Sequence, residues 1–316
     1  MKKIIHFRVK PRIKEWIIET LIRSSAVIVI VSLILIFLFV GKETLPIFFS
    51  SEIKQEVNLN RLFLPQARQN EKFVWQPIST VPKYSIIPLI IGTLKTTIIA
   101  LLFALPLAIG AAIFTSEFAP TWLRELIKPA IELLAGVPSV VLGFFGLIVL
   151  ATWLQNIFSW TFRLNAITAG IALGLAILPV VYTVTEDALS AVPNSYREGS
   201  LALGANVWQT AWGVVLPAAL PGIFAACVLG FGRAFGETMI VLMASGNAAI
   251  TSLKFTDSVR TLSATIATEL AEVVVGSAHY YTLFFIGTFL FVFTFINNIL
   301  GQWFVQRLRK RLHGET

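Results

Sequence analysis

The chain has 316 residues, of which 56% are hydrophobic and only 13% are charged, and 25 Lys and Arg against 17 Asp and Glu give a net charge of +8. A soluble globular domain carries about a quarter charged residues, so this composition excludes a disordered chain, a secreted disulfide scaffold and an ordinary cytosolic enzyme. The one cysteine, Cys227, lies inside an apolar run and has no partner for a disulfide within the chain.

Long apolar segments account for most of the sequence. A helix that crosses a bilayer needs about 20 mostly apolar residues. Six segments meet this criterion, near residues 24–41, 86–114, 129–154, 166–189, 218–244 and 280–304. They are long and continuous, which predicts helices instead of barrel strands. We therefore expect an all-α, polytopic membrane protein with six transmembrane helices, the first of them an uncleaved anchor because no small-residue cleavage site follows it.

The Lys and Arg residues indicate the orientation of these spans, because cytoplasmic loops carry an excess of them. With both termini in the cytoplasm, 14 basic residues lie on the cytoplasmic side and 9 lie outside, while Lys95 and Arg233 fall within spans. We therefore expect a multi-pass protein of the cytoplasmic (inner) membrane with both termini inside. The basic residues flank apolar segments, so orientation in lipid explains the net charge better than nucleic-acid binding does.

This topology divides the chain into four parts. They are a basic cytoplasmic N-terminus with the first anchor (1–41), an external loop (42–85), a five-helix core (86–304) with a cytoplasmic loop (190–217), and a basic cytoplasmic tail (305–316). The external loop is polar and contains four prolines, which favours a small cap. A second external stretch, Ser245–His279, carries an apolar pattern that predicts a short interfacial or re-entrant helix.

No catalytic or cofactor motif is found along the chain. The phosphate-binding pattern G-x-x-x-x-G-K-[ST] does not occur, so the chain is not expected to bind ATP itself. Its histidines, His6, His279 and His313, are scattered without metal-site spacing. The sequence therefore predicts a non-enzymatic chain with no metal or cofactor of its own.

The cytoplasmic loop between the fourth and fifth spans is rich in helix-capping signals. Ser195 and Glu198 have the spacing of a capping box, and Asn206 and Gln209 repeat it. Gly204 lies between the two pairs, where a residue with positive φ would end a helix. We expect two short helices joined by a sharp turn. The first would form a docking knob that presents Tyr196, Leu201 and Leu203 to a partner, while Arg197 and Glu198 face solvent or a polar groove.

The spacing in this loop resembles a known signature. Glu198, Gly199 and Ser200 are followed after three residues by Gly204 and after nine more by Val214-Val215-Leu216-Pro217. This resembles the pattern E-A-A-x3-G-x9-I-x-L-P of ABC importer permeases, with small or apolar substitutions at three positions. The resemblance implies a type I ABC importer permease fold and a coupling helix seated in a groove of an ATPase subunit, formed here by Ser195, Tyr196, Arg197, Glu198, Gly199, Ser200, Leu201, Ala202, Leu203 and Gly204.

The fifth span contains a charged pair. Arg233 lies about midway along it, where an arginine costs roughly 2.5 to 3.5 kcal/mol to insert. Glu237 follows four residues later, on the same face of a continuous helix. A guanidinium matches two oxygens of a phosphate-like anion, and a neighbouring carboxylate would weaken capture enough to permit release. The alternative is a fixed ion pair that only orders the helices.

Other charged and small residues near the spans carry weaker expectations. Lys95 could lie in the pathway or extend its ammonium to the outer surface. Lys128 and Glu132 have the spacing of an ion pair at a helix end. Further residues are expected to serve packing or loop support: Gly170 and Gly174 in helix contacts, and Glu186 and Asp187 in supporting the coupling loop.

Four segments together resemble the permease subunits of phosphate ABC importers of the PstC type. They are GTLKTT at 92–97, LAGVPSVVLGFFGL at 134–147, the coupling loop, and GRAFGETMIVLMASGN from Gly232. Met239, the basic N-terminus and the first anchor favour this type over the sibling PstA type. The resemblance implies that Arg233 and Glu237 belong to the phosphate pathway.

The same resemblance implies a set of partners. They would be a second permease of the PstA type, a homodimer of PstB-type ATPase subunits that binds ATP and Mg, a periplasmic or lipid-anchored phosphate-binding protein of the PstS type, and membrane lipids. Two alternatives stay open at this stage. One is a secondary transporter or channel for a tetrahedral oxyanion, and the other is the permease of a related ABC importer for sulfate or molybdate.

Overall fold

A computed structural model describes residues 13–65 and 73–313 of the chain. The first twelve residues, with most of the N-terminal basic cluster, and the last three lie outside the described residues. The helical elements are α1 (Ile13–Thr44), α2 (Pro46–Phe49), α3 (Ser51–Glu56), α4 (Leu59–Phe63), α5 (Ile87–Ile113), η1 (Phe114–Phe118), α6 (Thr121–Ala135), α7 (Ser139–Phe145), η2 (Gly146–Leu150), α8 (Ala151–Phe158), α9 (Ala166–Ser190), α10 (Asn194–Ala202), α11 (Val207–Thr210), η3 (Ala211–Val215), α12 (Leu216–Gly236), α13 (Met239–Ala244), α14 (Leu262–Glu269) and α15 (Ala278–His313). Two short strands, β1 (Trp75–Gln76) and β2 (Lys83–Tyr84), pair as an antiparallel hairpin.

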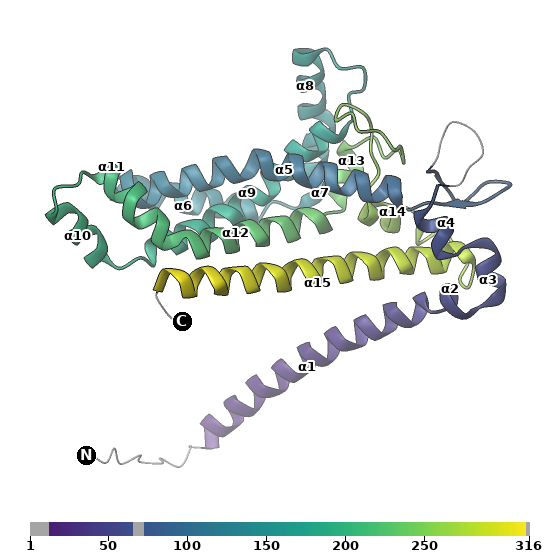
Figure 1. Cartoon of the computed structure of the whole chain (residues 1–316), viewed down its shortest axis with the longest axis horizontal. Coiled ribbons are helices and arrows are strands. Elements are labelled where there is room, and N and C mark those ends of the chain that lie inside the picture. The colour runs from purple at the N-terminus through teal and green to yellow at the C-terminus, as the bar shows by residue number, and fades with distance from the viewer. Residues whose placement is uncertain (1–12, 66–72, 314–316) are drawn as a thin grey trace.

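Six helical segments of the described chain are long and apolar enough to cross a membrane. Figure 1 shows α5, α9, α12 and α15 running lengthwise beside one another, with α10 and α11 at the end where α15 finishes and with α2 to α4 and the hairpin at the other end. The predicted all-α class with six spans is confirmed, apart from the small hairpin. The polar segments thus gather at the two ends of this bundle.

Small residues bring the central helices close together. A Cβ atom on Gly170 would lie 2.6 Å from Ile99, and one on Gly174 would lie 2.7 Å from Phe103, so α9 and α5 touch where α9 has no side chain. Gly301 of α15 meets Val228 of α12 in the same way, at 2.4 Å. The prediction that Gly170 and Gly174 serve helix packing is confirmed.

The first helix stands apart from the bundle. Residues 15–39 of α1 are exposed, and Figure 1 shows α1 diverging from α15 along most of its length. The contacts between them lie near the end of α1 and in the first half of α15, where Phe37 packs on Phe291 with ring centroids 5.1 Å apart and the Thr44 and Thr288 hydroxyls lie 2.8 Å apart. The predicted anchor therefore exists as a helix, and it adds little to the core.

The predicted third span, 129–154, is wrong as a single helix. The structure divides it into α6, which ends at Ala135, and a second segment that begins at Ser139. Pro138 separates them because it has no amide hydrogen to donate and disfavours helical backbone in the residue before it. The apolar segment that can span a membrane is therefore 139–158, and α6 is a separate helix against α9.

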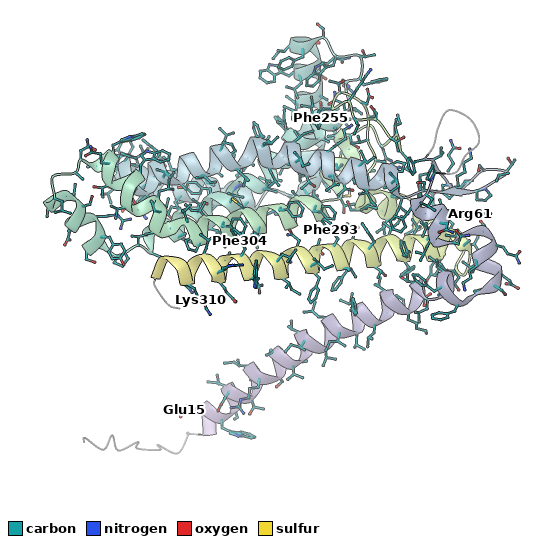
Figure 2. The ribbon with its side chains drawn as sticks, viewed as in Figure 1. Glu15, Arg61, Phe255, Phe293, Phe304 and Lys310 are labelled. Carbon is teal, nitrogen blue, oxygen red and sulfur yellow. The ribbon has the colours of Figure 1, made fainter. Side chains whose placement is uncertain are left out.

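The predicted fifth span, 218–244, is also interrupted. Helix α12 ends at Gly236, Glu237 adopts extended backbone (φ −68°, ψ 137°), and α13 starts at Met239. Phe235 stacks on Phe293 with centroids 4.4 Å apart, and Phe293 lies about 15 residues, roughly 22 Å, along α15 from its start. Figure 2 shows Phe293 and Phe304 on α15 where it runs along α12. The interruption therefore lies partway along the length of the bundle and not at its end.

The loop 42–85, which the sequence predicts to be external, forms a folded cap over the end of α14 and the start of α15. Trp75, Tyr84 and His279 pack together with ring centroids 6.1 to 6.3 Å apart, and the Tyr84 hydroxyl donates to Glu56 at 2.7 Å. The Trp75 indole donates to both oxygens of Glu269, at 3.1 and 3.2 Å. The stretch 245–279 contains α14, a short helix as predicted, followed by turns.

Lys95 lies at the same end of the bundle as this cap. Its side chain is buried, and its ammonium donates to the carbonyl oxygens of Ser252 and Lys254 at 3.0 and 2.6 Å. It therefore holds the loop after α13 against α5 and does not extend to the surface. In this position the Lys95 ammonium serves as a packing contact and not as a residue of the transport pathway.

Candidate coupling loop and anion pathway

The loop between α9 and α12 folds as two short helices, α10 and α11, joined at Gly204. Gly204 has φ +88°, the left-handed conformation that glycine adopts without steric cost. The capping box of Asn206 and Gln209 is present, because each side chain bonds the backbone amide of the other. Both features agree with the sequence prediction.

The capping box predicted for Ser195 and Glu198 is wrong. Helix α10 begins at Asn194, two residues earlier than a cap at Ser195 would place it, with Pro193 before it and no side-chain cap. The Pro193 carbonyl accepts from the Tyr196 amide at 3.1 Å and so provides the first helical hydrogen bond. Pro193 itself stays outside the helix (φ −59°, ψ 139°), where its missing amide hydrogen costs no helical hydrogen bond, so the helix can begin directly after it. Ser195 is consequently an exposed residue inside the helix.

One face of the loop carries exposed apolar side chains. Leu203 is 91% exposed, and Tyr196, Leu201 and Trp208 are at least 46% exposed. Phe118, Trp208 and Trp212 form a row of rings with neighbouring centroids 5.6 Å apart, in which Trp208 and Trp212 are exposed. A group of exposed apolar side chains on an otherwise polar loop is typical of a contact with another protein. The predicted docking knob therefore has the expected exposed residues, with Glu198, Gly199 and Ala202 also exposed and Ser200 partly covered.

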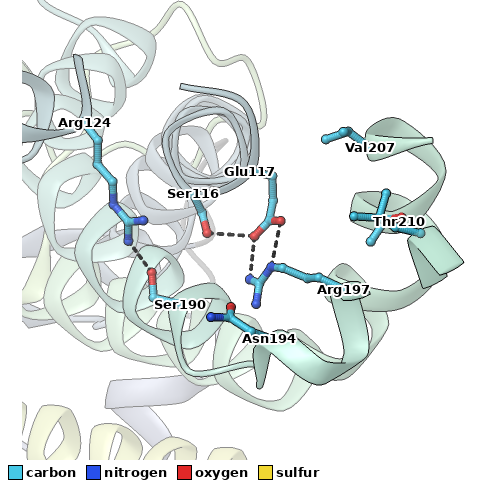
Figure 3. Close-up of a pocket in the computed structure, with 9 residues that line it drawn as sticks. Ser116, Glu117, Arg124, Ser190, Asn194, Arg197, Val207 and Thr210 are labelled. Carbon is cyan, nitrogen blue, oxygen red and sulfur yellow. Dashed lines mark hydrogen bonds and ion pairs between the residues drawn. The ribbon is translucent and has the colours of Figure 1, made fainter. Parts of the chain in front are cut away.

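Arg197 points into a polar cavity of about 430 Å³, which Leu201 and Val207 also line. Its Nε and Nη2 donate to the two carboxylate oxygens of Glu117, at 3.1 and 2.7 Å. Nη1 donates to the carbonyl of Val192 at 2.7 Å, and Nη2 also reaches the carbonyl of Leu189 at 3.0 Å. Figure 3 shows Arg197 extended from α10 toward Glu117, with Ser116 beside it. Arg197 therefore faces a polar groove, one of the two surroundings predicted for it from the sequence.

A second charged cluster braces α6 against α9. Glu186 is fully buried and accepts from Arg124, from Ser190 at 3.0 Å and from Lys128 at 2.7 Å. Lys128 also reaches Asp187 at 3.1 Å, and its hydrogen bond with Glu186 raises the pKa of Lys128. The pair predicted for Lys128 and Glu132 is therefore wrong. Glu186 and Asp187 support α6 and the end of α9, next to the coupling loop.

Arg233 and Glu237 do not lie on one helical face, because α12 ends between them. Arg233 occupies the last turn of α12 and is exposed, and Glu237 is half-buried beyond the helix end. Within the described residues, no ion pair or hydrogen bond joins the two side chains. Ser263 of α14 donates to the carbonyl of Glu237 at 2.7 Å and holds the extended segment in place. The fixed ion pair between Arg233 and Glu237, which the sequence left open as an alternative, is therefore not found among the described residues.

Two amides in the last span are not among the residues predicted from the sequence, although polar residues in an apolar helix are themselves a signal. Asn298 is exposed, and its Oδ1 lies 3.8 Å from where a Cβ of Gly232 would be. The Nδ2 of Asn297 is buried, with no hydrogen-bond partner in the described chain. Arg233 therefore lies near other polar groups at the depth of the helix break.

Comparison with known proteins places the chain among transport proteins. Residues 104–310 match the family model described as binding-protein-dependent transport system inner membrane component. A probable ABC transporter permease protein, YqgH of Bacillus subtilis, is 39% identical over 74% of this chain and 75% of that protein. The phosphate transport system permease proteins PstC of Mesorhizobium japonicum and Haemophilus influenzae are 36% and 33% identical, over 75% of this chain and 77% and 80% of those proteins.

Solved structures share the fold at low sequence identity. A bacterial alginate ABC transporter in complex with its periplasmic protein matches with a TM-score of 0.61 and 17% identity, over 95% of this chain and 99% of that chain. The MetNI methionine ABC transporter in an inward-facing conformation matches with a TM-score of 0.55 and 16% identity, over 70% of this chain and 95% of that chain. These likenesses show the fold of ABC importer permeases.

Proposed function

Because the chain belongs to the family of binding-protein-dependent transport system inner membrane components, we propose that it is the permease subunit of an ATP-driven phosphate importer. The observation that carries the proposal is Arg233, an exposed guanidinium in the last turn of α12, well away from both ends of the bundle. The 30 to 39% identity to PstC proteins and to YqgH supports it. The chain itself contributes a membrane pathway and a coupling loop.

Exposure of Arg233 argues for a second permease. A charged side chain at mid-depth is costly in lipid and normally faces protein or a water-filled cavity. In this chain Arg233 faces outward from α12 at the place where the helix is broken. A second subunit that covered this face would enclose Arg233 and Asn298 in a pathway between the two chains. We assign this role to a permease of the PstA type.

The chemistry at Arg233 suits transient binding of phosphate. A guanidinium offers two parallel donors to the oxygens of a tetrahedral anion. No carboxylate of the described residues pairs with Arg233, so its donors are available. Glu237 lies on the adjacent non-helical segment, and its negative charge would weaken the hold on the anion. Binding would then be strong enough for entry and weak enough for release.

The proposed orientation places both termini and the coupling loop in the cytoplasm. Figure 1 shows the start of α1, the loop of α10 and α11, and the end of α15 at one end of the bundle. A homodimer of PstB-type ATPase subunits, which would bind ATP and Mg, would dock on the exposed face around Leu203. A PstS-type binding protein would deliver phosphate at the opposite end. ATP-driven closure would convert an inward-facing pathway into an outward-facing one.

Two alternatives are less well supported. A secondary transporter or channel would work without an ATPase, whereas family membership and the exposed coupling loop favour an ATP-driven complex. A permease for sulfate or molybdate would use the same guanidinium chemistry, and the names of the PstC relatives favour phosphate. Transport assays with each anion distinguish these cases.

The experiment that tests the proposal is phosphate uptake by the assembled complex with Arg233→Gln. We expect uptake to be abolished while assembly is retained, because glutamine removes the charge and the five-donor fork. Arg233→Lys should keep partial activity, and Glu237→Gln should impair uptake through the unbalanced charge of Arg233. Normal uptake by Arg233→Gln, with assembly verified, would refute the role of Arg233 as the anion contact.

A further inference from the structure

Arg197 differs from its neighbours on α10 in the direction of its side chain. Tyr196 and Leu203 are exposed and do not line the cavity that Arg197 enters. The Arg197 side chain is 20% exposed, and its partner Glu117 is 7% exposed. A residue that the sequence groups with the docking contact is thus turned toward the bundle. Four hydrogen bonds to Glu117, Leu189 and Val192 occupy most of its donors.

The bonds of Arg197 tie three elements together. Both carboxylate oxygens of Glu117 accept from it, and Glu117 belongs to η1, the wide helical turn that ends the α5 span. The carbonyls of Leu189 and Val192, at the end of α9, accept its other hydrogen bonds. A cation at a helix C-terminus is favourable because the unpaired carbonyls there carry partial negative charge. One side chain of α10 is therefore bonded to the cytoplasmic ends of two spans.

The rest of α10 is loosely attached. A Cβ placed on Gly199 or on Gly204 would meet no atom within 4 Å. Ser200 makes one hydroxyl contact with Thr210, at 3.0 Å, which links α10 to the start of the 207–236 segment and not to α5 or α9. Among the described side chains of α10, Arg197 makes the hydrogen bonds to η1 and to the end of α9, so a displacement of α10 reaches α5 and α9 through it as well as through the chain connection at residues 191–193. The spans that receive it, α5 and α9, are packed closely at Gly170 and Gly174 and would move together.

We propose that the pair of Arg197 and Glu117, here called the loop joint, is a positioning contact that transmits displacement of α10 to α5 and α9. The inference rests on the proposed function, because it concerns how ATP-driven motion reaches the pathway. Arg197 does not contact the ATPase subunit in this assignment. Bidentate geometry fixes both the distance and the angle between the two side chains, which a transmitting contact requires and a simple docking contact does not.

The test uses the complete complex in proteoliposomes, with phosphate uptake and ATP hydrolysis measured on the same sample. Glu117→Gln removes the charge and one acceptor oxygen but keeps the side-chain shape. We expect the ATPase subunits to copurify and to hydrolyse ATP, while the phosphate transported per ATP falls about tenfold, the factor expected for loss of one charge-assisted hydrogen bond. Arg197→Lys keeps the charge without the fork and should give an intermediate ratio.

A matched control is Glu125→Gln, an exposed carboxylate on α6 at the same end of the bundle. It should leave both rates unchanged. An unaltered transport-to-hydrolysis ratio in Glu117→Gln and Arg197→Lys would overturn the loop joint, as would loss of the ATPase subunits from either variant or failure of both to insert. If the unmodified complex does not transport phosphate, the proposed function itself fails, which separates the two outcomes.

Discussion

A Cβ atom placed on Gly92 would lie 2.2 Å from the carbonyl oxygen of Arg260. Gly92 is near the outer end of α5, and Arg260 ends the loop that precedes α14. The backbone of this loop thus rests directly on the helix, and Lys95 holds the same loop through the carbonyls of Ser252 and Lys254 one turn further along. The loop is positioned by main-chain contact, which leaves no room for a side chain at residue 92.

Gly92→Ala should therefore destabilise the protein. Relief of the clash requires movement of backbone on one side, so the free energy of unfolding should fall by about 1 to 3 kcal/mol, the usual cost of overpacking. Gly110→Ala is the matched control on the same helix, because a Cβ there meets no atom within 4 Å. Thermal unfolding in detergent measures both variants. Equal melting temperatures for the two would contradict the close approach of Arg260 to α5.

Gly204→Val should disrupt the coupling loop. At φ +88° a β-branched residue is strained by roughly 1 to 2 kcal/mol or more, so the turn between α10 and α11 should change shape. Copurification of ATPase subunits and transport-coupled hydrolysis should both decrease. Gly199→Ala is the control in the same loop, since residue 199 lies inside α10 with open space around it and alanine favours helix by about 0.5 to 1 kcal/mol. Intact coupling in Gly204→Val would remove the docking assignment.

Cysteine labelling of intact cells tests the orientation. In a Cys227→Ala background, Ile78→Cys at the exposed end of the hairpin should react with an impermeant maleimide from outside. Lys310→Cys, exposed near the end of α15, should react only after permeabilisation. Figure 2 marks the position of Lys310. The reverse pattern would place the termini outside and invert the proposed topology.

The outer cap should lose stability in acid through Glu269. Burial alone would raise the pKa of Glu269, but hydrogen bonds from His279 and Trp75 and the charge of Arg260 outweigh it and lower the pKa below its ordinary value. A carboxylate whose pKa is lower in the folded protein than in the unfolded chain stabilises the fold at pH values above the unfolded pKa, which is about 4.3 for Glu. This stabilisation is lost as the pH falls through the pKa of the folded protein. Glu269→Gln should melt lower than the unmodified protein at neutral pH.

The difference between the two melting temperatures should shrink as the pH drops below about 4.3, because protonated Glu269 resembles glutamine. Glu272→Gln provides the comparison, since its exposed side chain lies three residues away. It should show no such pH-dependent difference. A constant difference for Glu269→Gln across this range would mean that its hydrogen bonds do not depend on its charge.

Features that depend only on residues close together in the chain can be predicted from the amino-acid sequence alone. Length and polarity of each apolar run decide whether a helix can cross a bilayer, so six spans are predicted and six are present. The turn at Gly204 and the capping box of Asn206 and Gln209 follow from interactions across three or four residues. The family signature in the same loop is equally local, and residue spacing is therefore enough to indicate the family.

The choice of partner for each charged group depends instead on tertiary packing. Arg197 finds Glu117 at a separation of 80 residues, and Lys128 finds Glu186 at 58 instead of Glu132 at four. The break at Glu237, held by Ser263 of α14, separates it from Arg233 although their spacing fits one helix face. The hydrophobic periodicity of the sequence does not predict such contacts. A buried charge pairs with whichever partner the packed helices bring within hydrogen-bond distance.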